Sequence, residues 1–132
     1  MREIKFKARS IKNGEWVKGY YAKLGKGENI KHYIIENREF LGFSKDNMFF
    51  NDVEIDSNTL CQYTELKDKY KKEIYENDRI HYYYEDLDED CYGTVIWEER
   101  IGMFLIKFDD GCCDDFDHVY ARDIEVIGNK FE

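Results

Sequence analysis

The residues that could carry chemistry are four cysteines, three histidines and two groups of aspartates. A structural zinc site needs pairs of ligands two to four residues apart, brought together from two places in the chain. No two cysteines have that spacing. The thiols and the histidine nearest to them are Cys61, Cys91, Cys112, Cys113 and His118. The sequence therefore predicts no metal ion and no other cofactor.

The first acidic group places Asp86, Asp88 and Asp90 at positions one, three and five of a calcium-loop pattern. Cys91 then stands where such a loop needs Gly, and Trp97 stands where it needs Glu. The second group surrounds Gly111 and consists of Asp109, Asp110, Asp114, Asp115 and Asp117. Both groups fall in expected hairpin loops, where we interpret them as solvated charge with at most weak cation binding.

Enzyme signatures are missing from the chain. A hydrolase holds its nucleophile beside a base, but no serine lies in a Gly-x-Ser-x-Gly turn. Cys113 and His118 could form a nucleophile–base pair, but the sequence gives no geometry for it. No phosphate-binding loop or dinucleotide fingerprint is present. We expect a non-enzymatic protein. The alternative from this class is an enzyme with an unfamiliar acidic site for a divalent cation.

Composition limits the class of protein further. The chain has 132 residues, 17% of them aromatic, and a formal net charge of −9. Many aromatic side chains favour β-structure and exclude a disordered chain. No apolar stretch approaches the roughly 20 residues of a membrane helix, and the first residues lack a secretory signal. We therefore expect the cytosol, where the thiols stay reduced; the resemblance described below implies that this is the cytosol of a bacterial host.

The elements that must position these residues are mostly strands. In the first strand, Ile4, Phe6 and Ala8 alternate with charged residues, which predicts a buried apolar face with Phe6 in the core. Asn13-Gly14 supplies the two positive-φ residues of a type I′ turn, and residues 15–22 return as the second strand. Residues 32–35 and 48–50 are further expected strands.

The last third of the chain reads as a small barrel. Strands are expected at residues 79–84, 92–97, 103–108 and 124–127, separated by the acidic run and by turns with Gly. Residues 64–76 are ambiguous, because Leu66, Tyr70 and Ile74 have helical spacing while the comparison below predicts a turn, which we favour.

Three segments together resemble the YopX family of phage and prophage proteins. They are residues 1–7 (MREIKFK), residues 62–69 with 72–78 (QYTELKDK and KEIYEND), and residues 124–129 (IEVIGN). The resemblance spans the chain and implies a β-rich fold with an SH3-like C-terminal part. It implies no enzymatic activity and no site residues. The motif residues are expected to pack or to cap turns; they are Tyr63, Leu66, Ile74, Tyr75 and Asp78.

The chain departs from the family pattern at a few positions. The family usually has Gly at the positions of Cys61, Glu65 and Asn77, and Asn-Gly at Tyr70-Lys71. Asn tolerates the left-handed region, so position 77 is a mild change, whereas a turn with Lys71 is strained.

The fold class predicted is mostly β (all β or α+β): a single domain over residues 1–132, with possible sub-units at 1–62 and 63–132. The former contains the hairpin and the latter an SH3-like barrel.

Two surfaces are candidates for binding another macromolecule. One is aromatic and consists of Tyr82, Tyr83, Tyr84 and Trp97, although core packing together with ordinary surface tyrosines is the slightly favoured explanation of these residues. The other is a basic face of the first hairpin and consists of Lys5, Lys7, Arg9, Lys12, Lys18 and Lys23. The net charge favours a protein partner; a nucleic-acid-binding module using the basic face is the alternative.

Overall fold

The structure is a computed structural model and describes residues 4–36 and 52–132. All of its regular elements are strands or single 3₁₀ turns, which confirms the mostly β fold class. The expected strand at residues 48–50 lies outside the described residues. The strands are β1 (Phe6–Ser10), β2 (Trp16–Leu24), β3 (Lys31–Glu36), β4 (Asp52–Lys67), β5 (Glu73–Tyr75), β6 (Asp78–Tyr84), β7 (Glu89–Glu98), β8 (Met103–Phe108), β9 (Cys113–Asp115) and β10 (Ile124–Asn129). The 3₁₀ turns are η1 (Gly27–Asn29), η2 (Glu85–Leu87) and η3 (Ala121–Asp123).

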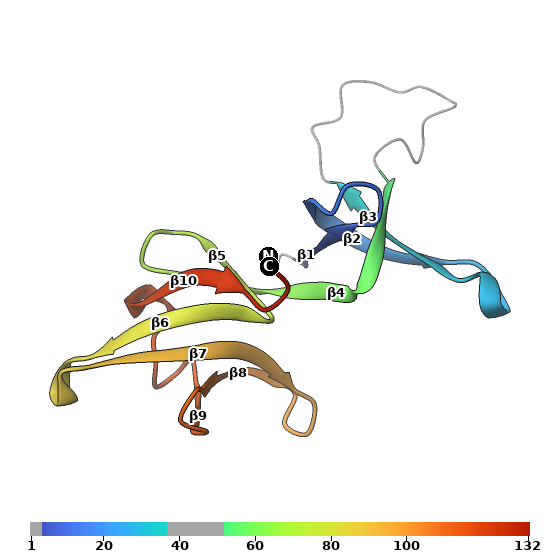
Figure 1. Ribbon diagram of the computed structural model, residues 1–132. Coiled ribbons are helices and arrows are strands. Elements are labelled where there is room, and N and C mark those ends of the chain that lie inside the picture. The colour runs from blue at the N-terminus through green and yellow to red at the C-terminus, as the bar shows by residue number, and fades with distance from the viewer. Residues whose placement is uncertain (1–3, 37–51) are drawn as a thin grey trace. The chain divides into compact units, whose positions relative to one another are not determined.

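The chain divides into two compact units between Gln62 and Tyr63. We call them the N-terminal unit and the C-terminal unit. The long strand β4, which bends along its length in Figure 1, contributes to both. The division falls where the possible sub-units were drawn; that the chain is a single domain stays a prediction. Within the described residues, no helix is long and apolar enough to cross a membrane.

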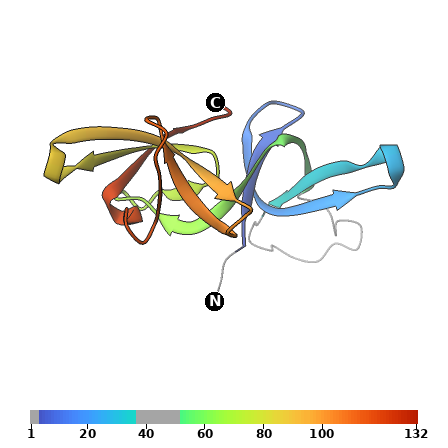
Figure 2. The same ribbon diagram turned by 90° about the horizontal axis from the view of Figure 1, so that it is seen from below.

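In the N-terminal unit, four strands close on themselves. β1 pairs with β2 on one side and with β4 on the other, and β3 also pairs with both β2 and β4. The hairpin of β2 and β3 continues beyond β1 as a two-stranded ribbon (Figure 2). Gly19 lies where β2 passes β3 so closely that an added Cβ would sit 2.0 Å from the Ile35 carbonyl oxygen. This closure encloses a small core of Ala8, Ile34 and Ile55.

The first strand forms as predicted, but its alternation does not describe its burial. Ala8 is fully buried, Phe6 is only partly buried against the core, and Ile4 is 54% exposed. On the opposite face, Lys7 is 9% exposed because β4 runs beside it and places the buried Cys61 opposite. The expectation that Phe6 is a core residue is therefore wrong: it lies at the margin of the cluster.

We accordingly expect Phe6→Ala to lower the free energy of unfolding by about 2 kcal/mol, below the roughly 3–5 kcal/mol of a fully buried phenylalanine. The loss comes from the contact with Tyr21, whose ring centroid lies 5.7 Å away, and from the apolar cluster. Urea unfolding followed by far-UV circular dichroism measures it. Ile34→Ala in the same core is the control and should cost more; an equal or smaller loss there would contradict this account.

The first hairpin is confirmed, but its turn is not of type I′. Gly14 has a φ of 72°, whereas Asn13 is not among the residues of positive φ. Ser10 and Glu15 instead close a longer loop, with the Ser10 amide donating to the Glu15 carbonyl and the Gly14 amide donating to the Ser10 carbonyl. The Asn13 side chain accepts a hydrogen bond from the Glu15 amide, 3.0 Å away. This bond fixes the loop without a left-handed asparagine.

The C-terminal unit is built on a five-stranded antiparallel sheet in the order β10-β6-β7-β8-β9 (Figure 1). Its strands follow the expected segments, with two short additions, β5 and β9, that the sequence did not indicate. β5 pairs with the end of β4 rather than with this sheet. The closer assignment to an SH3-like barrel stays a prediction.

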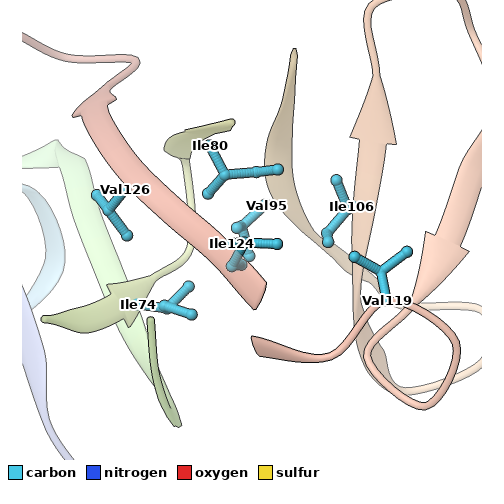
Figure 3. Packing of buried hydrophobic residues seen from close by; sticks show 7 residues of the cluster. All are labelled: Ile74, Ile80, Val95, Ile106, Val119, Ile124 and Val126. Atoms are coloured by element: carbon cyan, nitrogen blue, oxygen red, sulfur yellow. The ribbon is translucent and has the colours of Figure 1, made fainter. Parts of the chain in front are cut away.

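Seven aliphatic side chains from the strands and connecting loops form the core of this unit (Figure 3). They are Ile74, Ile80, Val95, Ile106, Val119, Ile124 and Val126. Five of them have no exposed surface at all. Leu66 and Tyr82 pack against this cluster from its margin, and Tyr82 is thereby anchored at one end of the sheet.

Residues 64–76 form the end of β4, a turn and β5, so the turn is confirmed and the helix is wrong. Asp68 holds the turn, because its carboxylate accepts the amide hydrogens of Tyr70, Lys72 and, 58 residues away, Val126. Asp78 accepts the amide hydrogen of Tyr75 and so caps the next turn, as expected. Tyr63, Ile74 and Tyr75 are buried, as the resemblance predicted.

Candidate protein-binding hollow

A concavity of the C-terminal unit lies where β6 ends. Its volume is about 660 Å³, within the roughly 300–1,000 Å³ of ordinary binding pockets. We call it the tyrosine hollow. Its walls come from five places in the chain, namely the β4–β5 turn, β6 with η2, β9, the loop after β9, and η3. The lining residues are Lys69, Tyr82, Tyr83, Tyr84, Glu85, Asp86, Asp114, His118, Val119, Arg122 and Asp123.

Two tyrosines supply aromatic surface to the hollow. Tyr82 and Tyr84 are two residues apart on β6, so their side chains share a face of the sheet. Their ring centroids are 5.9 Å apart and the rings are nearly perpendicular, at 80°. Tyr84 is 39% exposed, whereas Tyr82 packs against the core. Burial, followed by the nearby Asp123 carboxylate, raises the pKa of the Tyr82 hydroxyl, so it remains a neutral hydrogen-bonding group at physiological pH.

Acidic groups outnumber basic ones in the hollow. Four carboxylates line it, against the fixed positive charges of Lys69 and Arg122. Both cations have aromatic partners that are not among the lining residues. The Lys69 ammonium lies 5.2 Å from the centre of the Tyr70 ring, and the Arg122 guanidinium lies 4.9 Å from that of Tyr120. The hollow is therefore both acidic and aromatic.

His118 and two aspartates form a cluster at one side of the hollow. The ring nitrogen Nδ1 of His118 lies 2.7 Å from Asp115 and 3.5 Å from Asp114. Among the described residues, this is the one group whose ligand atoms are close enough to share a cation. Asp115 also accepts the backbone amide hydrogens of Asp117 and His118, which accounts for the cluster as a loop-stabilising unit.

This pairing predicts a measurable titration. The hydrogen bond with Asp115, then the charges of Asp115 and Asp114, raise the pKa of His118 above 6.5, and the same bond lowers the pKa of Asp115. The ion pair therefore contributes to stability only above the lowered carboxyl pKa and below the raised imidazole pKa. We expect Asp115→Asn to lower the His118 pKa, measured by NMR titration of its ring protons. Asp52→Asn, in the other unit, should leave it unchanged; a common decrease in both variants would contradict the pairing.

The structure brings together only part of the expected aromatic surface. Tyr82, Tyr83 and Tyr84 line the hollow, and the Tyr83 hydroxyl donates to Asp88. Trp97 is 41% exposed and contacts Phe104 edge-on, with ring centroids 4.9 Å apart. It lies six residues along β7 from Cys91, the partner of Tyr82, which is about 20 Å at the rise of a β-strand. Trp97 is therefore not part of the tyrosine hollow.

The basic face of the first hairpin is partly turned onto the protein itself. The Lys7 ammonium and the Arg9 guanidinium lie 4.8 Å and 4.7 Å from the Trp16 ring. Arg9 also donates to the Gly14 carbonyl oxygen, 2.8 Å away. Lys5 is partly buried. Lys12, Lys18 and Lys23 are exposed, so the continuous row of cations expected from the sequence is reduced to separate charges.

The remaining sequence candidates are placed as follows. Asp88 accepts from Tyr83 and Asp90 from His81, whose Nε2 lies 2.7 Å away, so the calcium-loop carboxylates serve different partners. Nδ1 of His118 is bonded to Asp115 rather than directed to Cys113. All four cysteines lie in the described parts of the chain, and none is in a disulfide.

Sequence reasoning noted several residues of the hollow but did not bring them together. Asp114 was noted only as part of an acidic group, and His118 only as a partner for a thiol. Lys69, Arg122 and Asp123 carried no signal, because they come from turns that become neighbours only when β10 pairs with β6. An acidic excess in the second half of the chain was the one available indication.

Comparison with known proteins supports the fold and the family. The chain is similar to protein EF1440 from Enterococcus faecalis, whose crystal structure aligns with a TM-score of 0.56 at 22% sequence identity. The alignment covers 98% of this chain and 94% of that protein; at this identity it supports the fold alone. No curated protein matches the chain. The YopX protein family profile matches residues 5–132, nearly the whole chain, and the chain therefore belongs to the YopX family.

Proposed function

We propose that this protein is a non-enzymatic accessory protein of a phage or prophage that binds a basic segment of another protein through its C-terminal unit. The observation that carries the proposal is the division of charge between the units. Residues 1–62 contain eleven Lys and Arg against nine Asp and Glu, whereas residues 63–132 contain nine against twenty. The C-terminal unit therefore accounts for the whole net negative charge of the chain. The resemblance to the YopX family of phage and prophage proteins supports the proposed phage or prophage setting.

The acidic side chains are available at the surface. All six residues from 85 to 90 are exposed, and so are Asp109, Asp110 and Asp117. These residues lie after β6, β8 and β9, which belong to one sheet. A field of one sign steers an oppositely charged partner and speeds its association. A segment with several Lys or Arg residues complements this surface.

We prefer a protein to a nucleic acid, because phosphates would be repelled by the C-terminal unit and would find few accessible cations on the N-terminal unit. Lys7 is nearly buried, and both Lys7 and Arg9 lie against Trp16. Nucleic-acid affinity depends on several cations that reach phosphates together. The exposed Lys12, Lys18 and Lys23 are the remaining candidates for such contacts on the basic face.

The test compares a fluorescent octalysine peptide with single- and double-stranded DNA and RNA, using the full-length protein and a series of salt concentrations. We expect the peptide to bind with an affinity that falls as salt rises, and the nucleic acids to bind far more weakly. The opposite result would be micromolar binding of a nucleic acid near physiological salt, abolished by Lys12→Glu/Lys18→Glu. It would replace this proposal with the nucleic-acid alternative.

A matched pair of variants locates the binding. Glu89→Gln/Glu99→Gln/Asp110→Asn removes three exposed charges from the C-terminal unit, outside the tyrosine hollow. Glu15→Gln/Glu28→Gln/Asp52→Asn removes three from the N-terminal unit. Both change the net charge equally. The first set should weaken octalysine binding several-fold more than the second; equal effects would mean that only the overall charge matters and would contradict a site on the C-terminal unit.

A further inference from the structure

We infer that the tyrosine hollow receives one arginine side chain of the partner; this rests on the proposed function and specifies where the basic segment is recognised. The hollow, at about 660 Å³, is larger than a guanidinium group and the end of its aliphatic stem. It therefore also holds part of the flanking peptide.

The rings provide the surface on which a planar cation stacks. Tyr82 and Tyr84 present perpendicular rings 5.9 Å apart, so that an incoming group meets the face of one ring and the edge of the other. A guanidinium is attracted to the face of an aromatic ring, and it stacks there more readily than the compact ammonium of lysine. The anchoring of Tyr82 in the core keeps its ring in place without a bound partner.

The carboxylates provide acceptors from separate directions. Asp86 lies on η2, Asp114 on β9 and Asp123 on η3. A guanidinium has five N–H donors in a fixed plane, so it can donate to carboxylates on different sides at the same time. A lysine ammonium can satisfy some of these acceptors but does not match the planar rings.

The two cations of the hollow do not fill this role themselves. Lys69 lies over Tyr70 and Arg122 lies over Tyr120, and neither of these two rings lines the hollow. The charges of Lys69 and Arg122 reduce the negative potential of the hollow, but neither cation lies over the hollow's own tyrosine rings. With His118 counted as a third cation when it is protonated, four carboxylates still outnumber the positive groups of the hollow, which favours a positive ligand.

The experiment titrates the full-length, ¹⁵N-labelled protein with three peptides: acetyl-Gly-Arg-Gly-amide and its lysine and citrulline counterparts. Citrulline keeps the planar shape but carries no charge. We expect the arginine peptide to shift the amide signals of residues 82–86 and 121–123, the lysine peptide to bind about threefold more weakly or worse, and the citrulline peptide to produce no saturable shift.

Variants separate the hollow from the general acidity of the unit. Tyr84→Ala and Asp123→Asn should each weaken arginine-peptide binding about fivefold. The controls are Tyr92→Ala, which removes a similarly exposed tyrosine, and Asp110→Asn, which removes an exposed carboxylate; both lie outside the hollow. Each control should change the affinity for the arginine peptide less than twofold.

The inference fails if the shifted amides lie elsewhere, if the hollow variants bind like their controls, or if lysine binds as well as arginine. In each of these cases octalysine binding by the C-terminal unit would still support the proposed function. If octalysine also fails to bind, the proposed function fails as well.

Discussion

Asp78→Ala is expected to lower the free energy of unfolding by about 3–5 kcal/mol, a large share of the roughly 5–15 kcal/mol of a typical domain. Asp78 has no exposed surface, yet both of its carboxylate oxygens have partners. Oδ2 accepts the amide hydrogen of Tyr75 at 2.7 Å, and Oδ1 accepts from Nδ2 of Asn129 at 2.9 Å, 51 residues away. Truncation leaves two buried donors without these acceptors and also opens a cavity.

Asp78→Asn distinguishes the lost hydrogen bonds from the lost volume. One oxygen becomes an amide group, which must face a donor. The Asn129 side chain cannot rotate to present its oxygen to this amide group without losing another hydrogen bond, because its Oδ1 already accepts the amide hydrogen of Phe131. The asparagine variant should therefore lose about half as much as the alanine variant.

Guanidinium chloride unfolding followed by tryptophan fluorescence measures both Asp78 variants. Asp86→Ala, at an exposed position, is the control and should change stability by less than about 0.5 kcal/mol. A loss below about 1 kcal/mol in Asp78→Ala would show that its partners find other acceptors.

Glu65→Gly/Lys71→Gly is expected to stabilise the protein by about 2 kcal/mol. Both residues have left-handed backbone conformations, with φ of 71° and 64°. Glu65 lies in an irregularity of the β4–β5 pairing, and Lys71 in the turn closed by Asp68. A residue with a Cβ pays about 1–2 kcal/mol there, whereas glycine pays only its larger loss of backbone entropy. The net gain is therefore about 1 kcal/mol at each position.

These positions are among those at which the YopX family usually has glycine, and the conformation explains the preference. Asn77 is the third, with φ of 69°. Because asparagine tolerates this region, Asn77→Gly should change stability by less than about 0.5 kcal/mol. Lys67→Gly, in a strand and outside the set of positive-φ residues, is the control and should destabilise. Thermal and denaturant unfolding measure the stability of the double variant, Asn77→Gly and Lys67→Gly. A double variant less stable than the parent would contradict the backbone strain at Glu65 and Lys71.

The segment that carries the resemblance to the YopX family, residues 62–78, also contains the turns with left-handed backbone conformations. The segment from Gln62 to Asp78 was predicted to be structural from its resemblance. In the structure it supplies two carboxylates, Asp68 and Asp78, that join distant segments through buried hydrogen bonds. The sequence alone could not settle its helical spacing, because Leu66 and Ile74 reach the core from β4 and β5 rather than from one helix.

Local features of the sequence were sufficient for the strands, since alternation and turn residues act over a few neighbours. Residues 79–84, 103–108 and 124–127 were placed in this way, as was the first hairpin. Burial was not determined locally. Lys7 is buried because β4, more than fifty residues later, runs beside β1, and Ile4, which precedes β1, is exposed. The turn type of the first hairpin was also predicted wrongly, because the Asn13 side chain accepts a hydrogen bond from the Glu15 amide.

The sequence by itself determined the mostly β class, the family and the acidic net charge. Only the tertiary structure decided which acidic and aromatic side chains lie together in the tyrosine hollow. Tyr84, Asp114 and Asp123 are separated by up to 39 positions in the sequence, and they line one hollow because the pairing of β10 with β6 and of β9 with β8 returns their loops to the end of the same sheet. Strand pairing between distant segments depends on the sum of many weak contacts, so no short stretch of residues encodes it.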